Sequence, residues 1–185
     1  MKADYYDRIL VELKETCSKF DNDSIDRLCE AILEARHVFL AGTGRSGLMV
    51  KAFAMRLMHL GLNAFVVGET TTPGISPGDL LIIGSGSGET GSIAVFAREA
   101  KKQNAKIGLF TIFPNSTVGK LADFTIRIIA PTRKNIQAND ITSIQPMGSL
   151  FEQSLLLLLD GMILKLMERM SVDPEAMFAN HANLE

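Results

Sequence analysis

The sequence has no tryptophan, only two cysteines and only three histidines among its 185 residues. Cys17 and Cys29 do not have the spacing of a metal-binding pair, and two cysteines are too few for a disulfide framework. A reducing compartment is therefore favoured. The motif GxxxxGK[ST] is absent, which disfavours a P-loop phosphotransferase, and HExxH is absent, so no metal site is indicated.

Strong charge of one sign and long hydrophobic runs are also lacking. The formal net charge is −2 and no run of five like charges occurs, so the basic face of a typical nucleic-acid binder is missing. The longest apolar stretch, 155–159, is followed by Asp160 and Lys165 and is too short and too charged to span a bilayer. Residues 1–6 are polar and lack the apolar centre of a signal peptide. We expect a cytoplasmic protein that binds neither nucleic acid nor a membrane.

The sequence is instead rich in apolar residues. Hydrophobic residues make up 46% of the chain and charged residues 22%, which is the profile of one globular domain over residues 1–185. Apolar side chains at helical spacing predict two helices before residue 37, separated by the polar stretch 21–24. One face of the first helix carries Tyr6, Ile9, Leu10, Leu13, Cys17 and Phe20.

From residue 37 the pattern changes to strands that alternate with helices. Short apolar runs predict strands at 37–41, 63–67, 79–83, 106–112 and 124–129, with helices at 48–60 and 89–103. The runs are continuous rather than alternating, as in strands that are covered on both faces of a parallel sheet. We therefore predict an α/β fold, a three-layer sandwich around a five-stranded parallel sheet.

A last long helix is expected from Ser149 to about Met170. It is apolar nearly all round, so it has to be buried on most sides. Its surroundings are either a subunit interface, which we favour in so small a protein, or the core of the chain itself. The polar segment 130–147 before it has no clear period, and long loops of this kind are often functional in compact domains.

Two loops rich in glycine and hydroxyl groups follow the first and third predicted strands. If the first strand lies between the second and the third, both loops flank the ligand crevice of such a sheet. The second loop runs into a helix N-terminus, where free N–H groups favour an anion. Its hydroxyls and amides predict a phosphate site, and the alternative is a flexible turn whose serines cap the next helix. The candidate binding residues of this loop are Ser85, Gly86, Ser87, Gly88, Glu89 and Thr90.

The first loop, at 42–47, has its three glycines spaced as in the dinucleotide fingerprint GxGxxG. Glu69, at the end of the second predicted strand, is placed to hold a ribose, so a nicotinamide-dependent enzyme is a competing hypothesis. The loop is polar where a dinucleotide loop is often apolar, and the hydroxyl-rich second loop would remain unexplained. We therefore predict that Gly44, Arg45 and Ser46 bind substrate or phosphate.

Glu152 is the candidate general base. It lies at the start of the last helix between apolar residues, so its carboxylate can be ionised and still sheltered from water. A single carboxylate can take a proton from one carbon and return it to the neighbouring carbon through an enediol, which moves a carbonyl group along a carbon chain. The alternative is structural, because Ser149 and Glu152 also have the spacing of a capping box.

The histidines are weaker candidates. His37 opens a predicted strand and is interpreted as structural. His59 lies late in the helix predicted at 48–60 and is either a helix-end histidine or a group that handles protons, so it is included as a second catalytic candidate. His181 lies in the tail 180–185, which is either a frayed terminus or a flap over a neighbouring site.

Taken together, the glycine loops at 42–47 and 84–91 and the segment 145–152 (QPMGSLFE) resemble the sugar isomerase (SIS) domain family. The sequence SGSGET at 85–90 marks only the wider family, and its combination with the Glu152 segment is more specific. The loops show no departure from the family pattern. The similarity extends over essentially the whole chain, including 58–61, 67–70 and 183–185.

This resemblance implies a flavodoxin-like fold and the interconversion of D-arabino-3-hexulose 6-phosphate and fructose 6-phosphate without metal or cofactor. It places that reaction in the ribulose monophosphate route of formaldehyde fixation. It also implies a homotetramer, a phosphate held by the second loop, and Glu152 as the base. A non-catalytic sugar-phosphate-binding module is the second hypothesis, and a nicotinamide-dependent enzyme is the third.

Overall fold

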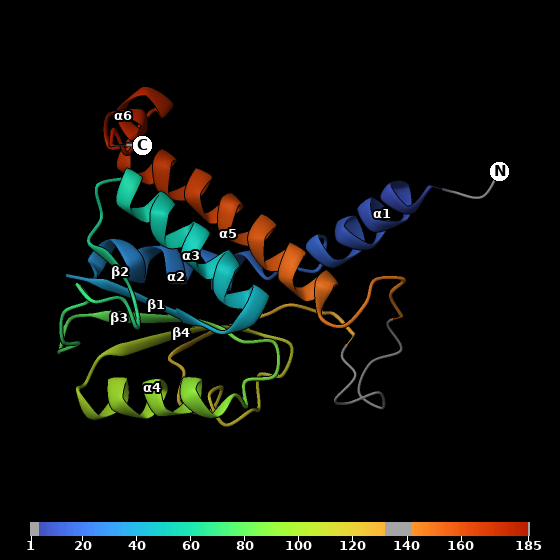
Figure 1. Cartoon of the computed structure of the whole chain (residues 1–185), viewed down its shortest axis with the longest axis horizontal. Coiled ribbons are helices and arrows are strands. Elements are labelled where there is room, and N and C mark those ends of the chain that lie inside the picture. Colours follow the sequence, from blue (N-terminus) through green and yellow to red (C-terminus); the bar gives the residue numbers. More distant parts are fainter. Residues whose placement is uncertain (1–3, 132–141, 185) are drawn as a thin grey trace.

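The computed structural model describes residues 4–131 and 142–184. Its centre is a sheet of five parallel strands in the order β2-β1-β3-β4-β5 (Figure 1). The strands are β1 (Val38–Gly42), β2 (Ala64–Val66), β3 (Leu80–Gly84), β4 (Lys106–Thr111) and β5 (Phe124–Arg127). The helices of the described part are α1 (Tyr5–Cys17), α2 (Asn22–Glu34), α3 (Gly44–His59), α4 (Gly91–Lys102), α5 (Ser149–Met170) and α6 (Pro174–Ala179).

The predicted five-stranded parallel sheet is confirmed. β1 lies between β2 and β3, which is the arrangement that the crevice hypothesis requires. Each strand falls close to the apolar run that predicted it. Nearly all residues of β1, β3 and β4 are buried, which explains why their sequences do not alternate between polar and apolar side chains.

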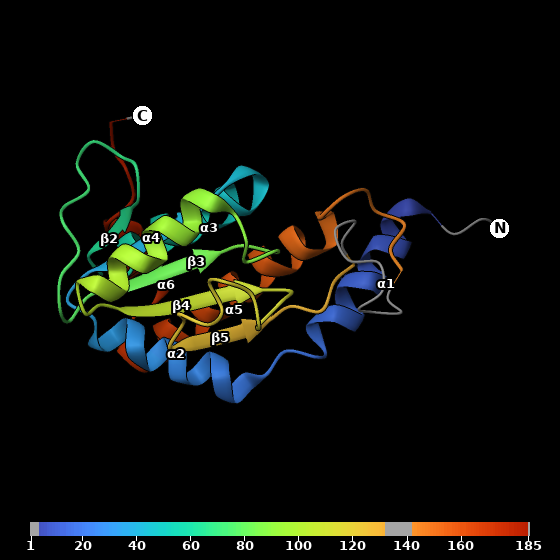
Figure 2. The same ribbon diagram turned by 90° about the horizontal axis from the view of Figure 1, so that it is seen from below.

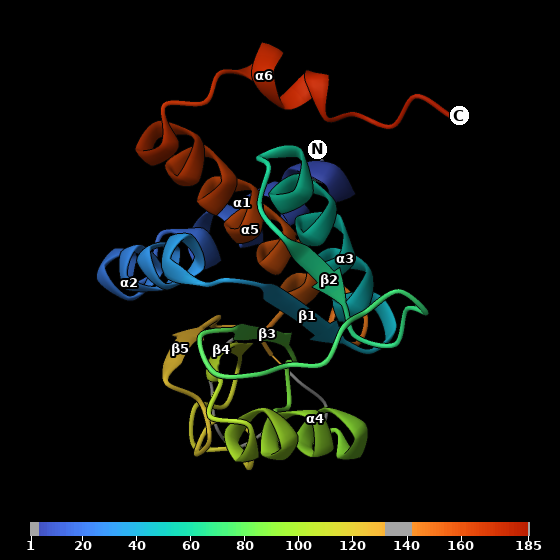
Figure 3. The ribbon, with the colours of Figure 1, turned by 90° about the vertical axis from the view of Figure 1, so that its left-hand side faces the viewer.

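The helices cover the two faces of the sheet unequally (Figure 3). α2, α3 and α5 lie on one face, and α4 covers the other. The larger hydrophobic core lies under the three helices and includes Leu28, Leu57 and Leu159. The smaller core lies under α4 around Ile93 and Leu109. The predicted three-layer sandwich is therefore confirmed.

α5 is confirmed over its predicted length, and most of its apolar side chains are buried within this one chain. Leu155, Leu159 and Met162, for example, are almost completely buried. The structure therefore favours the core alternative over the subunit interface for most of this helix. Leu157 and Leu164 are the exception, because their side chains are exposed on the outer side.

α1 extends away from the rest of the molecule, as Figures 1 and 2 show from two directions. The helical face that the sequence predicts is only partly covered by α5, the helix that α1 contacts most. Leu13 packs against the larger core. Tyr6 and Leu10 of the same predicted face remain exposed.

The structure differs from the predicted helices in two places. α3 begins at Gly44 and not near Leu48, so most of the first glycine loop is already the first turn of a helix. α6 was not predicted from the sequence, although Asp173 caps it by accepting a hydrogen bond from the Ala176 amide and Pro174 occupies its first position.

The polar segment predicted at 130–147 lies only partly within the described residues, because 132–141 lie outside them. The described end, 142–148, runs past α1 and leads into α5.

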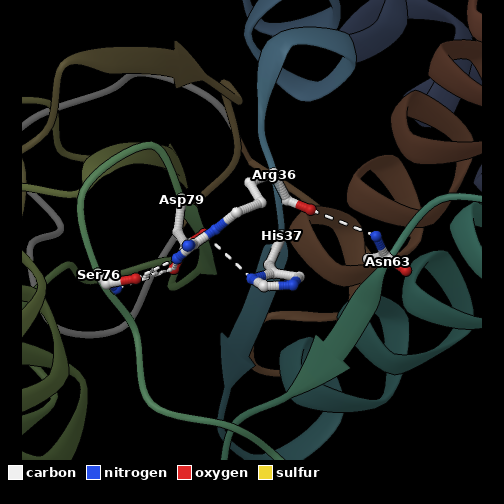
Figure 4. A network of polar contacts seen from close by, with 5 residues as sticks. All are labelled: Arg36, His37, Asn63, Ser76 and Asp79. Carbon is white, nitrogen blue, oxygen red and sulfur yellow. Dashed lines mark hydrogen bonds and ion pairs between the residues drawn. The ribbon is translucent and has the colours of Figure 1, made fainter.

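The buried carboxylate of Asp79 links residues that precede β1 and β3, at the amino ends of these strands (Figure 4). The glycine loops follow the opposite, carboxyl ends of the same two strands. Asp79, just before β3, accepts hydrogen bonds from the Arg36 guanidinium at 3.1 Å and 3.2 Å and from the Ser76 amide at 2.8 Å. Its Oδ1 also lies 3.2 Å from His37 Nδ1. Burial by itself raises the pKa of Asp79, but the bonds from Arg36 and Ser76 outweigh this and hold that pKa below its ordinary value.

Candidate active site

The carboxyl ends of β1 and β3 form the floor of the candidate site. Gly42 and Gly84 are paired in register there. A methyl group added at Gly42 would lie 2.8 Å from the Cα atom of Gly47, so the absence of a side chain lets α3 start directly behind the strand. Two glycine-containing segments thus leave adjacent strands at one edge of the sheet, as a ligand crevice requires.

The first segment turns immediately into a helix. Thr43 is its N-cap residue, and Gly44 has a φ of 57°, a value that favours glycine. The first helical hydrogen bond runs from the Gly47 amide to the Thr43 carbonyl. The amides of Gly44, Arg45 and Ser46 therefore precede the helix's own bonds and can face an anion. This geometry is compatible with their predicted binding role.

The second segment is stabilised by its own hydroxyl groups. Ser85 Oγ accepts a hydrogen bond from the Gly88 amide at 3.2 Å, and Ser87 Oγ accepts one from the Glu89 amide at 3.2 Å. Because each hydroxyl accepts from the loop, its own O–H proton can be donated to a ligand. The serines therefore order the loop and do not cap α4, whose N-cap Thr90 makes no side-chain capping bond.

The start of α4 adds unpaired backbone donors to these hydroxyls. The Ala94 amide makes the first helical bond, to the Thr90 carbonyl at 2.9 Å. The amides of residues 91–93 therefore have no partner within the helix and lie at the positive end of its dipole. Hydroxyl and amide donors at one helix N-terminus are the chemistry by which a phosphate can be held without a lysine.

Glu89 and Gly88 attach this loop to the segment at 113–121. Glu89 Oε1 accepts a hydrogen bond from the Thr117 amide at 2.7 Å, and the bonds with Thr117 hold the pKa of Glu89 below its ordinary value. A methyl group at Gly88, where φ is 62°, would collide with the Ser116 side chain. The sequence predicts Glu89 as a binding residue, whereas its carboxylate contacts the protein's own backbone. Ser116 and Thr117 were not predicted, because their partners are distant in the sequence.

Glu152 forms an ion pair with Arg45. The distance from Arg45 Nε to Glu152 Oε2 is 2.7 Å. The pair forms because α3 and α5 lie side by side (Figure 1) and both begin at the carboxyl edge of the sheet. Only 16% of the Glu152 side chain is exposed, so the carboxylate is sheltered from water but not completely buried.

The capping-box alternative for Glu152 is wrong. The N-cap residue of α5 is Gly148, not Ser149. The Ser149 amide donates to the Pro146 carbonyl at 3.2 Å and not to the Glu152 carboxylate. The carboxylate of Glu152 is therefore free of the structural role that the sequence spacing suggests.

The second loop lies next to the helix that carries Glu152. A methyl group built on Gly86 would be 3.4 Å from the ring of Phe151, the residue before Glu152. A methyl group built on Gly84 would be 3.2 Å from Leu155 of the same helix. The structure therefore brings the hydroxyl-rich loop, the start of α3 and the Glu152 carboxylate together at one end of the sheet.

His59 lies at the other end of α3. It is the last residue of that helix, about 21 Å along the axis from Arg45 at a rise of 1.5 Å per residue. The ring stacks on His181 at 5.4 Å, and burial, the positive charge of Arg56 and His181 lower the pKa of His59. Within one chain it is therefore not part of the Glu152 site, and the tail contacts the protein through His181 and through Asn180, which donates to the His59 carbonyl.

Across residues 4–131 and 142–184, no group of three or more histidine, cysteine, aspartate or glutamate residues is arranged to hold a metal ion. Within the same ranges, none of the helices combines the length and apolar character needed to cross a bilayer. Cys17 and Cys29 are free thiols.

The fold and this arrangement of the site define a class of protein. A family model described as SIS domain matches residues 31–157, well over half of the chain. The chain therefore belongs to the SIS domain family.

Relatives within that family match the chain over nearly its whole length. The 3-hexulose-6-phosphate isomerase of Bacillus subtilis is 51% identical over 99% of this chain and 98% of its own length. The 3-hexulose-6-phosphate isomerase of Mycobacterium gastri is 41% identical over 94% of this chain and 86% of its own length. A crystal structure from Methanococcus jannaschii, from which a molecular function of 3-hexulose-6-phosphate isomerase was inferred, has a TM-score of 0.84 and 35% identity, and covers 97% of this chain and 98% of that one.

Proposed function

We propose that this chain is a sugar-phosphate isomerase that interconverts D-arabino-3-hexulose 6-phosphate and fructose 6-phosphate. Relatives named 3-hexulose-6-phosphate isomerase, one of them 51% identical over 99% of the chain, support the activity. The structural observation that carries the proposal is the Glu152 carboxylate, held by Arg45 beside a hydroxyl-rich loop at a helix N-terminus.

The chemical step requires one group that both removes and returns a proton. Glu152 takes the proton from the carbon next to the carbonyl group, and an enediol forms as the carbonyl oxygen gains a proton. Glu152 then returns its proton to the former carbonyl carbon, and the neighbouring hydroxyl loses one to become the new carbonyl. The ion pair with Arg45 holds the carboxylate of Glu152 in one orientation at the carboxyl ends of the strands.

The phosphate supplies the binding energy that positions the reacting carbons. We assign it to the loop of Ser85, Ser87 and Thr90 and the first amides of α4, with Gly86 and Gly88 giving the backbone close access. The amides of Gly44, Arg45 and Ser46, which precede the first helical bond of α3, can add further donors from the neighbouring strand's end. Because the phosphate lies far from C2 and C3, its binding can orient the chain without taking part in the reaction.

The proposed substrate reduces the need for a second catalytic group. A ketone at C3 would close a five-membered ring through O6, but O6 carries the phosphate, so the 3-ketose stays open. A ring-opening acid is therefore needed only in the reverse direction, from fructose 6-phosphate. His59 stays a candidate for that acid only at a site shared with a second copy of the chain, since it lies far from Glu152 in its own chain.

We further propose that the chain acts in the cytoplasm as a homotetramer, in the ribulose monophosphate route of formaldehyde fixation. Free thiols are compatible with a reducing compartment. Exposed apolar side chains on the outer sides of α3 and α5 support association between copies; they are Leu48, Met55, Leu157 and Leu164.

The reaction is tested by incubating the protein with fructose 6-phosphate in heavy water. The proposal expects deuterium at C3 of the recovered fructose 6-phosphate, and a Glu152→Gln variant should lose this exchange by several orders of magnitude while still binding substrate. Deuterium at C1 would instead indicate an aldose–ketose isomerase. Normal exchange by Glu152→Gln would contradict the assigned base, and Asp160→Asn, on the same helix, is the control.

A sugar-phosphate-binding module would bind fructose 6-phosphate without any exchange of deuterium. A nicotinamide-dependent enzyme would be stabilised by NAD and not by fructose 6-phosphate. A thermal-shift comparison of the two ligands separates this third hypothesis from the others.

A further inference from the structure

Glu12 of α1 is bound by three donors from a segment far away in the sequence. Its carboxylate accepts hydrogen bonds from Ser143 Oγ at 2.7 Å, from the Ile144 amide at 2.8 Å and from Gln145 Nε2 at 3.0 Å. Gln145 also donates its amide to Ser143 Oγ at 3.0 Å. One carboxylate thus fixes the positions of three consecutive residues.

These bonds need the ionised form of Glu12. Burial by itself raises the pKa of Glu12, but the hydrogen bonds from Ser143, Ile144 and Gln145, with the nearby charge of Arg8, outweigh it and hold that pKa below its ordinary value. Hydrogen bonds to an ionised acceptor are stronger than those between neutral groups. The segment is therefore firmly attached to α1 at neutral pH.

The attached segment leads directly to the proposed base. Met147 has a φ of 57°, a left-handed backbone conformation that a side chain disfavours, and the Gly148 N-cap has no side chain to hold the start of α5. A methyl group built on Gly148 would lie 3.4 Å from Glu152 Oε1. The backbone of this turn therefore borders one carboxylate oxygen of Glu152, while Arg45 binds the other.

We infer that Glu12 is a positioning residue for the isomerase reaction: by holding Ser143–Gln145 it keeps the Met147–Gly148 turn against Glu152 and so fixes the orientation of that carboxylate. The inference rests on the proposed function, in which Glu152 is the base. Glu12 itself is outside the crevice and contacts no reacting atom. It acts only through the segment that it binds.

A purely structural role for Glu12 makes a different prediction. Leu150 and Phe151 are buried, and their packing can hold the first turn of α5 in place without the Glu12 hydrogen bonds. If that packing alone orients Glu152, loss of the Glu12 bonds lowers the melting temperature and leaves the turnover of the folded protein unchanged. A positioning role lowers turnover, and substrate binding at the second loop stays nearly the same.

The test uses the full chain with Glu12→Gln, which replaces one acceptor oxygen by an amide that faces other donors. We expect kcat for fructose 6-phosphate to fall at least about tenfold, because small displacements of a reacting group are costly, with KM within about twofold of the original. Glu15→Gln, which removes the same charge from the same helix, should keep both constants. Both variants are assayed well below their melting temperatures.

Ser143→Ala removes one of the three bonds to Glu12, together with the acceptor of the Gln145 amide, and provides a second test. Its kcat should fall by a few-fold, and the double variant with Glu12→Gln should lose little more than Glu12→Gln alone, because both changes act on the same contact. A kcat for Glu12→Gln equal to that of Glu15→Gln would overturn the inference. If the unmodified protein puts no deuterium into C3 of fructose 6-phosphate, the proposed function fails instead, and the inference fails with it.

Discussion

Arg45 Nε lies 2.7 Å from Glu152 Oε2, and this contact joins the first turns of α3 and α5. The Arg45 side chain is 58% exposed and that of Glu152 is 16% exposed. An ion pair with such an exposed partner contributes at most about 1 kcal/mol to folding. Its importance is therefore to the orientation of the carboxylate and not to the stability of the fold.

Replacing Arg45 should reduce turnover without unfolding the protein. In Arg45→Gln the carboxylate loses its charged partner, and we expect kcat to fall about tenfold with a change in melting temperature of only a few degrees. Arg45→Lys should recover part of the loss, because lysine supplies the charge but not the planar geometry. Steady-state kinetics of the three proteins test this, and equal kcat values would show that Arg45 does not orient Glu152.

Ser87→Ala should weaken substrate binding and leave turnover largely intact. The Ser87 hydroxyl accepts from the Glu89 amide and has its own proton left for a phosphate oxygen. A hydrogen bond to a charged group is worth about 1.5–3 kcal/mol, so KM should rise about tenfold or more. Ser18→Ala, at an exposed position after α1, is the matched control. A change restricted to kcat would argue against a phosphate at this loop.

Gly88→Ala should destabilise the protein, while Gly91→Ala three residues later should not. Gly88 has a φ of 62° and no room for a methyl group beside Ser116, so we expect a loss of about 3 kcal/mol in the free energy of unfolding. A methyl group at Gly91 meets nothing within 4 Å, and alanine is the better helix former. Urea unfolding of both variants measures the difference. Similar stabilities would mean that the loop adapts and is not held rigidly.

His59 should make folding sensitive to mildly acidic pH. Burial, Arg56 and His181 lower the pKa of His59, so the folded state favours the neutral ring. This contribution to stability is fully present above the ordinary histidine pKa of about 6.5 and is lost as pH falls through that value toward the lowered pKa. His59→Gln should therefore lose less stability than the original protein between about pH 7 and pH 5. The free energy of unfolding of both proteins is measured from pH 8 to pH 5. If it changes by the same amount in both, this linkage is ruled out.

The sheet can be predicted from the sequence because burial on both faces requires apolar side chains along the whole of each central strand. The residues of β3, for example, are buried on both faces and leave a continuous apolar run. The start of α3 could not be placed in the same way, because glycine is a poor helix former. The close contact between Gly42 and Gly47, which leaves no room for side chains, allows α3 to begin at Gly44, two residues after β1 ends.

The parts of the candidate site were predictable, and their connections were not. Glu152 and the serine-rich loop are recognisable by residue type and by their place next to helix starts. The partner of Glu152 depends on how α3 packs against α5, and the role of Glu12 depends on where α1 passes the segment before α5. Sequence spacing even favours a wrong partner, since Ser149 and Glu152 match a capping box that does not form.

The Asp79 cluster has a consequence for protein engineering. It links the residues before β1 and β3 (Figure 4), at the amino ends of the strands, whereas Glu152 lies at their carboxyl ends. We expect changes there to alter how much folded protein a cell accumulates and to leave the activity of each folded molecule unchanged. On this expectation, resistance to heat and substrate preference are adjusted separately, one at each end of the same sheet.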